Sequence, residues 1–167
     1  MVKYKGYHTT HRISGLNILK TKKFKCSDKN KEWLGKGVYF WHNEYTASNF
    51  WTKARKIENS MVLEADLFVN EEQVLDLDEE DQLTNFVDFC EALKKELVRS
   101  GKYIPLNNEQ EKWCFYSNYF KERYRIALIR RTFTAFGQVN IYPINRLQYC
   151  VSNEYKDEVI QNIKEVV

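Results

Sequence analysis

The chain has 167 residues, of which 43% are apolar and 15% aromatic, and its formal net charge is +3. This length and composition predict one domain with a substantial hydrophobic core. No apolar run is long enough to span a membrane and no secretory leader is visible, so we expect a soluble, cytoplasmic protein with no membrane partner. The four cysteines are far apart and form no CxxC pair, so we expect neither a metal site nor a disulfide framework.

Charge is unevenly distributed along the chain. Residues 3–36 are rich in lysine, residues 64–80 are acidic, and a second basic cluster runs from Lys121 to Arg131. Such runs are usually solvated faces, and a net charge of +3 is too small to predict a nucleic-acid partner. The abundance of Lys, Asn, Ile and Tyr suggests the AT-rich genome of a bacterium or its phage.

The first third of the chain predicts strands that alternate with helices. These elements are a strand at Val2–His8, a short helix at Arg12–Leu19, a brief strand at Phe24–Ser27, a strand at Val38–Trp41, and a helix that Asn43 caps and that ends near Lys56.

The remainder predicts a less regular order of strands and helices. Ser60–Val69 alternates in polarity as a strand with one core face, and Glu80–Arg99 carries an apolar stripe that includes Phe86 and Val87. Further elements are expected at Val74–Leu77 (strand), Glu109–Phe120 (helix), Tyr124–Phe133, Val139–Tyr142 and Leu147–Val151 (strands), and from Ser152 or Asn153 to the C-terminus (helix with Val159, Ile160, Ile163 and Val167). This order predicts an α+β fold.

Two short segments carry residues that could shape a ligand pocket. Tyr7-His8-Thr9-Thr10 ends the first predicted strand, and Gly35–Trp51 combines a glycine–lysine–glycine turn, an apolar strand and an aromatic-rich helix start. Without further information, Tyr39 and Phe50 in the second segment are best interpreted as core residues.

Taken together, these segments resemble the ADP-ribosyltransferase superfamily, on its diphtheria-toxin and poly(ADP-ribose) polymerase side. The family has a histidine in an H-G-S/T element on its first core strand, then a G-K-G-h-Y-F strand that leads into a helix. The corresponding residues here are His8-Thr9-Thr10 and the six residues from Gly35 to Phe40. The resemblance covers roughly residues 4–55 and 133–152. Within the superfamily, the chain resembles small bacterial or phage members.

A third motif residue of the family, often Glu, begins a late strand. Its best match is Gln148, because an apolar strand follows it, and Gln138 is the alternative. The resemblance then implies an H-Y-Q type motif of His8, Tyr39 and Gln148 as catalytic residues. Two positions depart from the family, since Thr9 stands for the usual Gly and Gln148 for the common Glu.

The resemblance implies one domain over residues 1–167, with a split antiparallel sheet flanked by helices and a helical insertion at about 79–120. It implies NAD as a substrate, broken at the bond between nicotinamide and ribose. The residues that it assigns to NAD binding are His8, Thr9, Thr10, Gly37, Tyr39, Phe50 and Ser27. Among these, His8 would bond a ribose hydroxyl, Tyr39 and Phe50 would enclose the nicotinamide, and Ser27 would reach the phosphates or adenosine.

The expected activity is therefore mono-ADP-ribosyl transfer to a macromolecule, either protein or nucleic acid, as in a toxin, an antiphage effector or a phage modifier. A neutral Gln148 cannot act as a general base, so polymer elongation is not expected. An antitoxin or regulatory partner would fit such a protein. The alternatives are an NAD glycohydrolase, an inactive module that binds NAD, ADP-ribose or a partner, and a nucleic-acid-binding domain without an NAD site.

Overall fold

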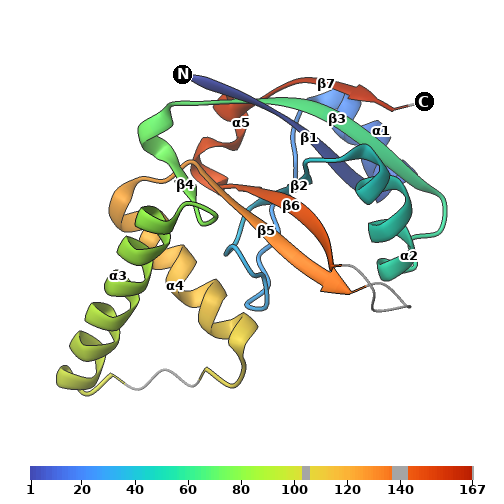
Figure 1. Cartoon of the computed structure of the whole chain (residues 1–167). Helices are drawn as coiled ribbons and strands as arrows, with labels where there is room; N and C mark the ends of the chain where they lie inside the picture. The colour runs from blue at the N-terminus through green and yellow to red at the C-terminus, as the bar shows by residue number, and fades with distance from the viewer. Residues whose placement is uncertain (103–105, 137–142, 167) are drawn as a thin grey trace.

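The computed structural model describes residues 1–102, 106–136 and 143–166 of the chain. Seven strands form one sheet in the order β4-β5-β6-β2-β1-β3-β7 (Figure 1). The strands are β1 (Val2–His11), β2 (Val38–Trp41), β3 (Ser60–Val69), β4 (Val74–Asp76), β5 (Leu128–Phe136), β6 (Pro143–Val151) and β7 (Ile160–Glu165). Neighbouring strands are antiparallel except β4 and β5, which are parallel. The fold is α+β, as the sequence predicts.

The helices lie around this sheet. They are α1 (Arg12–Thr21), α2 (Thr52–Arg55), α3 (Glu80–Arg99), α4 (Glu109–Tyr124) and α5 (Lys156–Val159), with a π-helix η1 (Thr46–Trp51) and two 3-10 helices, η2 (Glu71–Gln73) and η3 (Asn153–Tyr155). In the part of the chain that the structure describes, no helix is both long and apolar enough to cross a bilayer.

The helices α3 and α4 lie side by side at one end of the sheet, between β4 and β5 in the chain (Figure 1). Phe86 of α3 stacks on Trp113 of α4 with ring centroids 5.5 Å apart, and Phe86 is only 2% exposed. These helices occupy the position where the sequence predicts a helical insertion. Val87 was expected on the buried stripe of α3, but it is 44% exposed, because the apolar stripe is wider than the contact with α4.

Strand β3 confirms the alternation that the sequence predicts. Every second residue faces the core, and these buried residues are Met61, Leu63, Ala65, Leu67 and Val69. Side chains alternate between the two faces of a strand, so a single polar–apolar pattern fixes both the element and its orientation.

The sheet is nearly divided between β1 and β2. Strand β1 pairs with β3 along its whole length, from Val2 to His11, but its register with β2 is defined by the single pair Tyr7–Trp41. One further link joins them, because Nδ1 of His8 lies 2.8 Å from the backbone oxygen of Tyr39. This narrow connection places His8 directly beside the G-K-G-V-Y-F segment.

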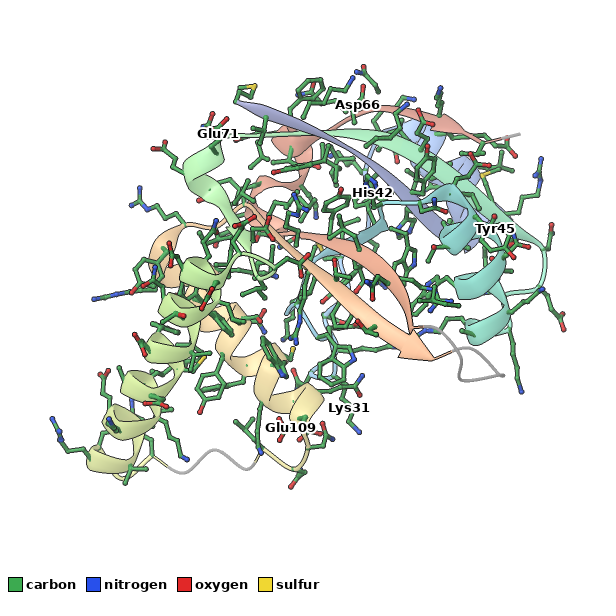
Figure 2. All side chains as sticks on the ribbon, in the orientation of Figure 1. Lys31, His42, Tyr45, Asp66, Glu71 and Glu109 are labelled. Carbon is green, nitrogen blue, oxygen red and sulfur yellow. The ribbon has the colours of Figure 1, made fainter. Side chains whose placement is uncertain are left out.

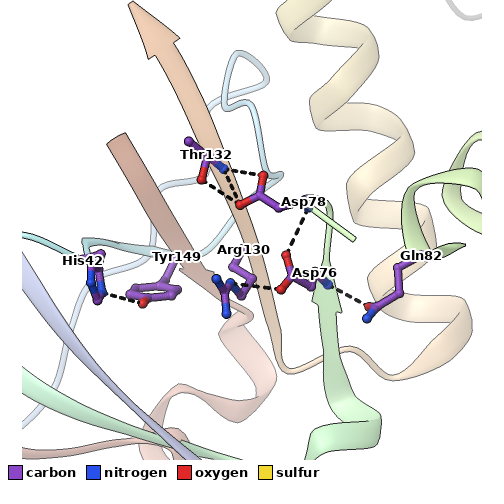
Figure 3. Close-up of polar contacts among 7 residues, drawn as sticks. All are labelled: His42, Asp76, Asp78, Gln82, Arg130, Thr132 and Tyr149. Atoms are coloured by element: carbon purple, nitrogen blue, oxygen red, sulfur yellow. Dashed lines mark hydrogen bonds and ion pairs between the residues drawn. The ribbon is translucent and has the colours of Figure 1, made fainter. Parts of the chain in front are cut away.

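A polar network fastens β4 and the start of α3 to the middle of the sheet (Figure 3). Asp78 accepts from the backbone N–H and the hydroxyl of Thr132, at 2.9 and 2.7 Å. Asp76 pairs with Arg130 at 3.3 Å, and the Tyr149 hydroxyl lies 2.9 Å from Nδ1 of His42. The His42 ring, which follows β2, is therefore held by Tyr149 of the neighbouring strand β6.

The predicted C-terminal helix is wrong. Residues 153–159 form only η3 and α5, and the chain then becomes strand β7. Val159, Ile160 and Ile163 are all buried, a spacing that fits a helix face equally well. The strand forms because the outer edge of β3 lacks a partner, and pairing with β7 satisfies its backbone groups.

Smaller differences affect other elements. Phe24–Ser27 is not a strand but contributes an isolated bridge between Ser27 and Gly37. The strand predicted from Tyr124 begins at Leu128 instead, because α4 continues to Tyr124 and ends at Arg125, whose φ is +54°. The predicted strand at residues 139–142 lies outside the described residues.

Candidate functional site

Glycines hold the loop before β2 close to its neighbours. A Cβ on Gly37 would lie 2.4 Å from the backbone oxygen of Val151, so only glycine lets β2 begin against β6. Gly35 has φ +80°, and a Cβ there would lie 2.6 Å from Oδ1 of Asn118 in α4. The glycines of this motif therefore serve the close packing of the loop on β6 and α4.

Tyr39 is fixed in place by this same loop. Its hydroxyl donates to the backbone oxygen of Gly35 at 2.6 Å and accepts from the N–H of Leu34 at 3.1 Å. Burial, with smaller contributions from the nearby Cys150 and Glu32, raises the pKa of Tyr39 well above its ordinary value. Tyr39 is therefore a rigid, neutral wall and not a proton donor or acceptor near neutral pH.

His8 is held in a defined tautomer. Because Nδ1 lies 2.8 Å from a carbonyl oxygen, Nδ1 carries the proton and Nε2 presents a lone pair. Burial lowers the pKa of His8, while the bond to Tyr39 opposes that shift. Its ring packs edge-on against Phe24 at 5.2 Å. His8 is thus a neutral, oriented acceptor of a hydrogen bond.

A hollow of about 600 Å³ lies on the His8 side of β2. We call it the histidine hollow, and its polar lining is His8, Thr10, Ser14, Asn17, Lys23 and Lys25. Hydroxyl, amide and ammonium groups therefore line the same hollow as the imidazole of His8.

A second hollow, of about 610 Å³, lies beside Gln148. We call it the tryptophan hollow, and its lining includes Trp33, Trp41, Trp51, Phe133, Glu32 and Gln148. Gln148 is 7% exposed, and within the described residues its amide makes no hydrogen bond. The second hollow therefore offers aromatic rings, one carboxylate and an unpaired amide.

The two hollows lie on opposite faces of the sheet. Alternate residues of β2 point to opposite faces, so Phe40 packs with His8 and Phe24, whereas Tyr39 packs with Cys150 in the second hydrophobic cluster. Two residues, Ser27 and Tyr39, line both hollows. The Ser27 hydroxyl donates a short hydrogen bond to Glu32. Ser27 therefore links the histidine hollow to the carboxylate of the tryptophan hollow.

The predicted site residues are thus brought together around β2, but not in one pocket. His8 and Thr10 line the histidine hollow, Gln148 lines the tryptophan hollow, and Tyr39 and Ser27 belong to both. Thr9 lines neither, since it is buried and its hydroxyl donates to the backbone oxygen of Ala47 at 2.6 Å. Gln138 and the side chain of Phe50 lie outside what the structure describes.

Several lining residues were missed from the sequence. Glu32, Trp33 and Arg55 in the tryptophan hollow, and Lys23 and Lys25 in the histidine hollow, come from segments without a motif. The only sequence signal was composition, because the loop at 20–36 is dense in lysine. In the described ranges, no group of three or more His, Cys, Asp or Glu side chains could hold a metal ion.

Comparison with known proteins gives little beyond the geometry. An uncharacterized protein of Methanocaldococcus jannaschii is 32% identical over 76 residues, a match that covers 42% of this chain and 36% of that protein. The chain therefore spans about a third of the length of this relative. No family model and no solved structure matches the chain.

Proposed function

We propose that the chain is a mono-ADP-ribosyltransferase that cleaves NAD and transfers ADP-ribose to a macromolecular target. The observation that carries this proposal is the pair of hollows joined across β2 by Ser27 and Tyr39. NAD has two unlike halves linked by a diphosphate, and two unlike hollows that share a boundary suit such a ligand. Strand β2, which carries Tyr39, shares the single register pair Tyr7–Trp41 with β1.

The histidine hollow suits the adenosine half and the diphosphate. The Nε2 lone pair of His8 can accept a hydrogen bond from a ribose hydroxyl. The hydroxyl and amide groups of Thr10, Ser14 and Asn17 can form hydrogen bonds with the rest of the sugar and with the base. Lys23 and Lys25 supply the positive charge that a diphosphate requires. Binding here needs His8 to be neutral, which its lowered pKa provides.

The tryptophan hollow suits the nicotinamide half. Tyr39 and Trp41 present aromatic rings beside Gln148, and the unpaired amide of Gln148 matches the carboxamide of nicotinamide. The hydrogen bonds of the Tyr39 hydroxyl to the loop keep that ring from moving when a ligand enters. Nicotinamide would therefore be held flat and oriented before any bond breaks.

Glu32 supplies the negative charge that Gln148 lacks. Departure of nicotinamide leaves positive charge on the ribose, and a carboxylate placed nearby stabilises that charge. Of the described residues that line the tryptophan hollow, Glu32 is the acidic one, and its bond to Ser27 directs it to the boundary between the hollows. A site with Gln at the late strand can therefore still favour cleavage of the glycosidic bond.

The proposal is tested with isotopically labelled NAD and purified protein. We expect release of nicotinamide together with transfer of label into lysate protein or nucleic acid, and a decrease of both with His8→Ala at NAD concentrations below the KM. If no nicotinamide is released and calorimetry shows no NAD binding, the proposal fails.

A second candidate is a module of the same fold that binds NAD or ADP-ribose without cleaving it. The buried Thr9, which stands where the family has Gly and bonds to Ala47, favours this candidate because it fills space next to η1. Binding of NAD without nicotinamide release would support it. Release of nicotinamide without transfer of label would instead indicate an NAD glycohydrolase.

A further inference from the structure

The tryptophan hollow has more aromatic surface than nicotinamide alone would use. Three partly exposed rings enter it from separate segments: Trp33 from the loop before β2, Trp51 from η1 and Phe133 from β5. Trp33 and Phe133 lie with ring centroids 6.2 Å apart, and Trp41 and Trp51 lie 5.4 Å apart. Aromatic rings on several sides suit a second planar ligand.

Arginine side chains accompany these rings. The guanidinium of Arg55 lies 4.5 Å from the Trp51 ring centroid, and that of Arg131 lies 5.4 Å from the Phe133 ring centroid. Arg131 is directly opposite Gln148 in the pairing of β5 with β6, so both lie on the same face of the sheet. Arg131 does not itself line the hollow, so it supports the Phe133 wall from behind. The stacked cation of Arg55 and the amide of Gln148 are groups that hold and read a nucleobase.

Basic side chains also reach this hollow, since Lys31 and Arg55 line it. Lys31 belongs to residues 20–36, a segment with seven lysines and two acids, whose Lys23 and Lys25 line the histidine hollow instead. On the other side, α2 and its end contribute Lys53, Arg55 and Lys56.

Little of this charge is neutralised by the protein itself. Among the described residues, the lysines of residues 20–36 form one ion pair with a carboxylate, from Lys31 to Glu111 at 3.9 Å. Figure 2 shows Lys31 near the start of α4. By contrast, Lys3 and Lys5 on β1 pair with Asp66 and Glu64 at 3.0 Å. Arg55 and Lys31 line the aromatic hollow, and Lys53 and Lys56 are close to Arg55 in the chain, which favours an anionic ligand that carries planar rings.

We propose that the tryptophan hollow binds a base of single-stranded nucleic acid, and that this base is the acceptor of ADP-ribose; the acceptor role rests on the proposed function. In the transfer, the bond from ribose C1′ to the nicotinamide nitrogen breaks and its electron pair stays on nicotinamide. A ring nitrogen or a carbonyl oxygen of the base bonds to C1′, and the proton that the base loses passes to Glu32. A paired base could not enter, because its faces and edge are covered in a duplex.

The binding test uses a fluorescein-labelled oligothymidine and the full chain, without NAD. Fluorescence anisotropy would compare the wild type with Trp51→Leu, Trp51→Phe and the matched control Tyr45→Leu, whose ring is 71% exposed on the same helical segment but does not line the hollow. We expect Trp51→Leu to weaken binding about tenfold, the contribution of one stacked base. Trp51→Phe should keep most of the affinity and Tyr45→Leu nearly all of it. Circular dichroism of each variant checks folding.

Two further arms separate the alternatives. The same strand in a duplex, and a labelled polyglutamate of equal charge, should bind more weakly than the single strand. Equal binding of polyglutamate, or equal affinity of Trp51→Leu and Tyr45→Leu, would overturn the base site and leave only charge attraction.

Labelled NAD then tests the acceptor. We expect label in the oligonucleotide, whereas label in protein alone would overturn nucleic acid as the acceptor. Because oligonucleotide binding needs no NAD, it can succeed when NAD cleavage fails. Nicotinamide release without oligonucleotide binding would overturn this inference and leave the proposed function standing.

Discussion

The histidine hollow and the tryptophan hollow share strand β2 but offer a ligand different chemistry. The first presents a neutral imidazole, hydroxyl groups and lysines, whereas the second presents aromatic rings, an amide and a carboxylate. The first is suited to a sugar and phosphates, and the second to flat rings. Tyr39 of β2 lines both hollows, and its backbone oxygen orients His8.

This difference makes the two hollows separable by mutation. A change on one face should affect one half of NAD, while a change at the strand itself should affect both halves.

The largest effect is expected from Gly37→Val. The new side chain would meet the Val151 oxygen at 2.4 Å, so β2 cannot stay against β6. Overpacking of this kind costs about 3 kcal/mol of the free energy of unfolding, measured by urea denaturation, and should abolish ligand binding in both hollows. The control is Gly101→Ala, where a Cβ meets nothing within 4 Å and only the φ of +67° resists. That variant should lose only about 1 kcal/mol.

Glu32→Gln should lower the rate of nicotinamide release about a hundredfold, because it removes the negative charge that faces the developing cation. The amide still accepts from Ser27, so the fold and the KM for NAD should change little. The matched control is Glu109→Gln, a side chain that is 68% exposed and paired with Lys112. An unchanged turnover in Glu32→Gln would remove Glu32 from the mechanism.

His8→Ala should weaken the binding of ADP-ribose about tenfold, which is the value of one hydrogen bond to a ribose hydroxyl. Binding of nicotinamide should not change, since His8 does not line the tryptophan hollow. Calorimetry measures both ligands, and His11→Ala, an exposed histidine at the end of β1, is the control. Equal weakening of both ligands would indicate a general loss of structure.

The smallest effect concerns stability and pH. Burial lowers the pKa of His8 in the folded state, so below the ordinary value of 6.5 the unfolded chain binds a proton that the folded chain does not. Stability should therefore fall as pH decreases from 6.5 toward the lowered pKa, by less than about 1.4 kcal/mol per pH unit. Urea denaturation of the wild type and His8→Ala at several pH values checks this. A slope that is the same in both proteins would show that His8 is not the titrating group.

The parts of the fold that the sequence predicted well have one dominant local pattern. Strand β3 alternates perfectly, and α3 begins and ends where the sequence places it, at Glu80 and Arg99. The C-terminal strand was missed because Val159, Ile160 and Ile163 suit a helix as well as a strand, and only the free edge of β3 decides between them.

The predicted site residues lie near one another around β2, but their arrangement in two hollows could not be predicted. His8, Tyr39 and Gln148 lie on adjacent strands, as their motifs suggest. Which face each side chain occupies depends on the register of β2 with both neighbours, and that is a tertiary property. Glu32 and the tryptophan walls could not be predicted, because a loop residue without a motif gains its role only through what packs beside it.

The central claim is that one NAD molecule spans both hollows. The most direct measurement is calorimetry of NAD, ADP-ribose and nicotinamide with His8→Ala, Gln148→Ala and the double variant. We predict that His8→Ala weakens NAD and ADP-ribose, that Gln148→Ala weakens NAD and nicotinamide, and that both losses appear in the double variant with NAD. NAD binding that is unchanged by either single variant would contradict the claim.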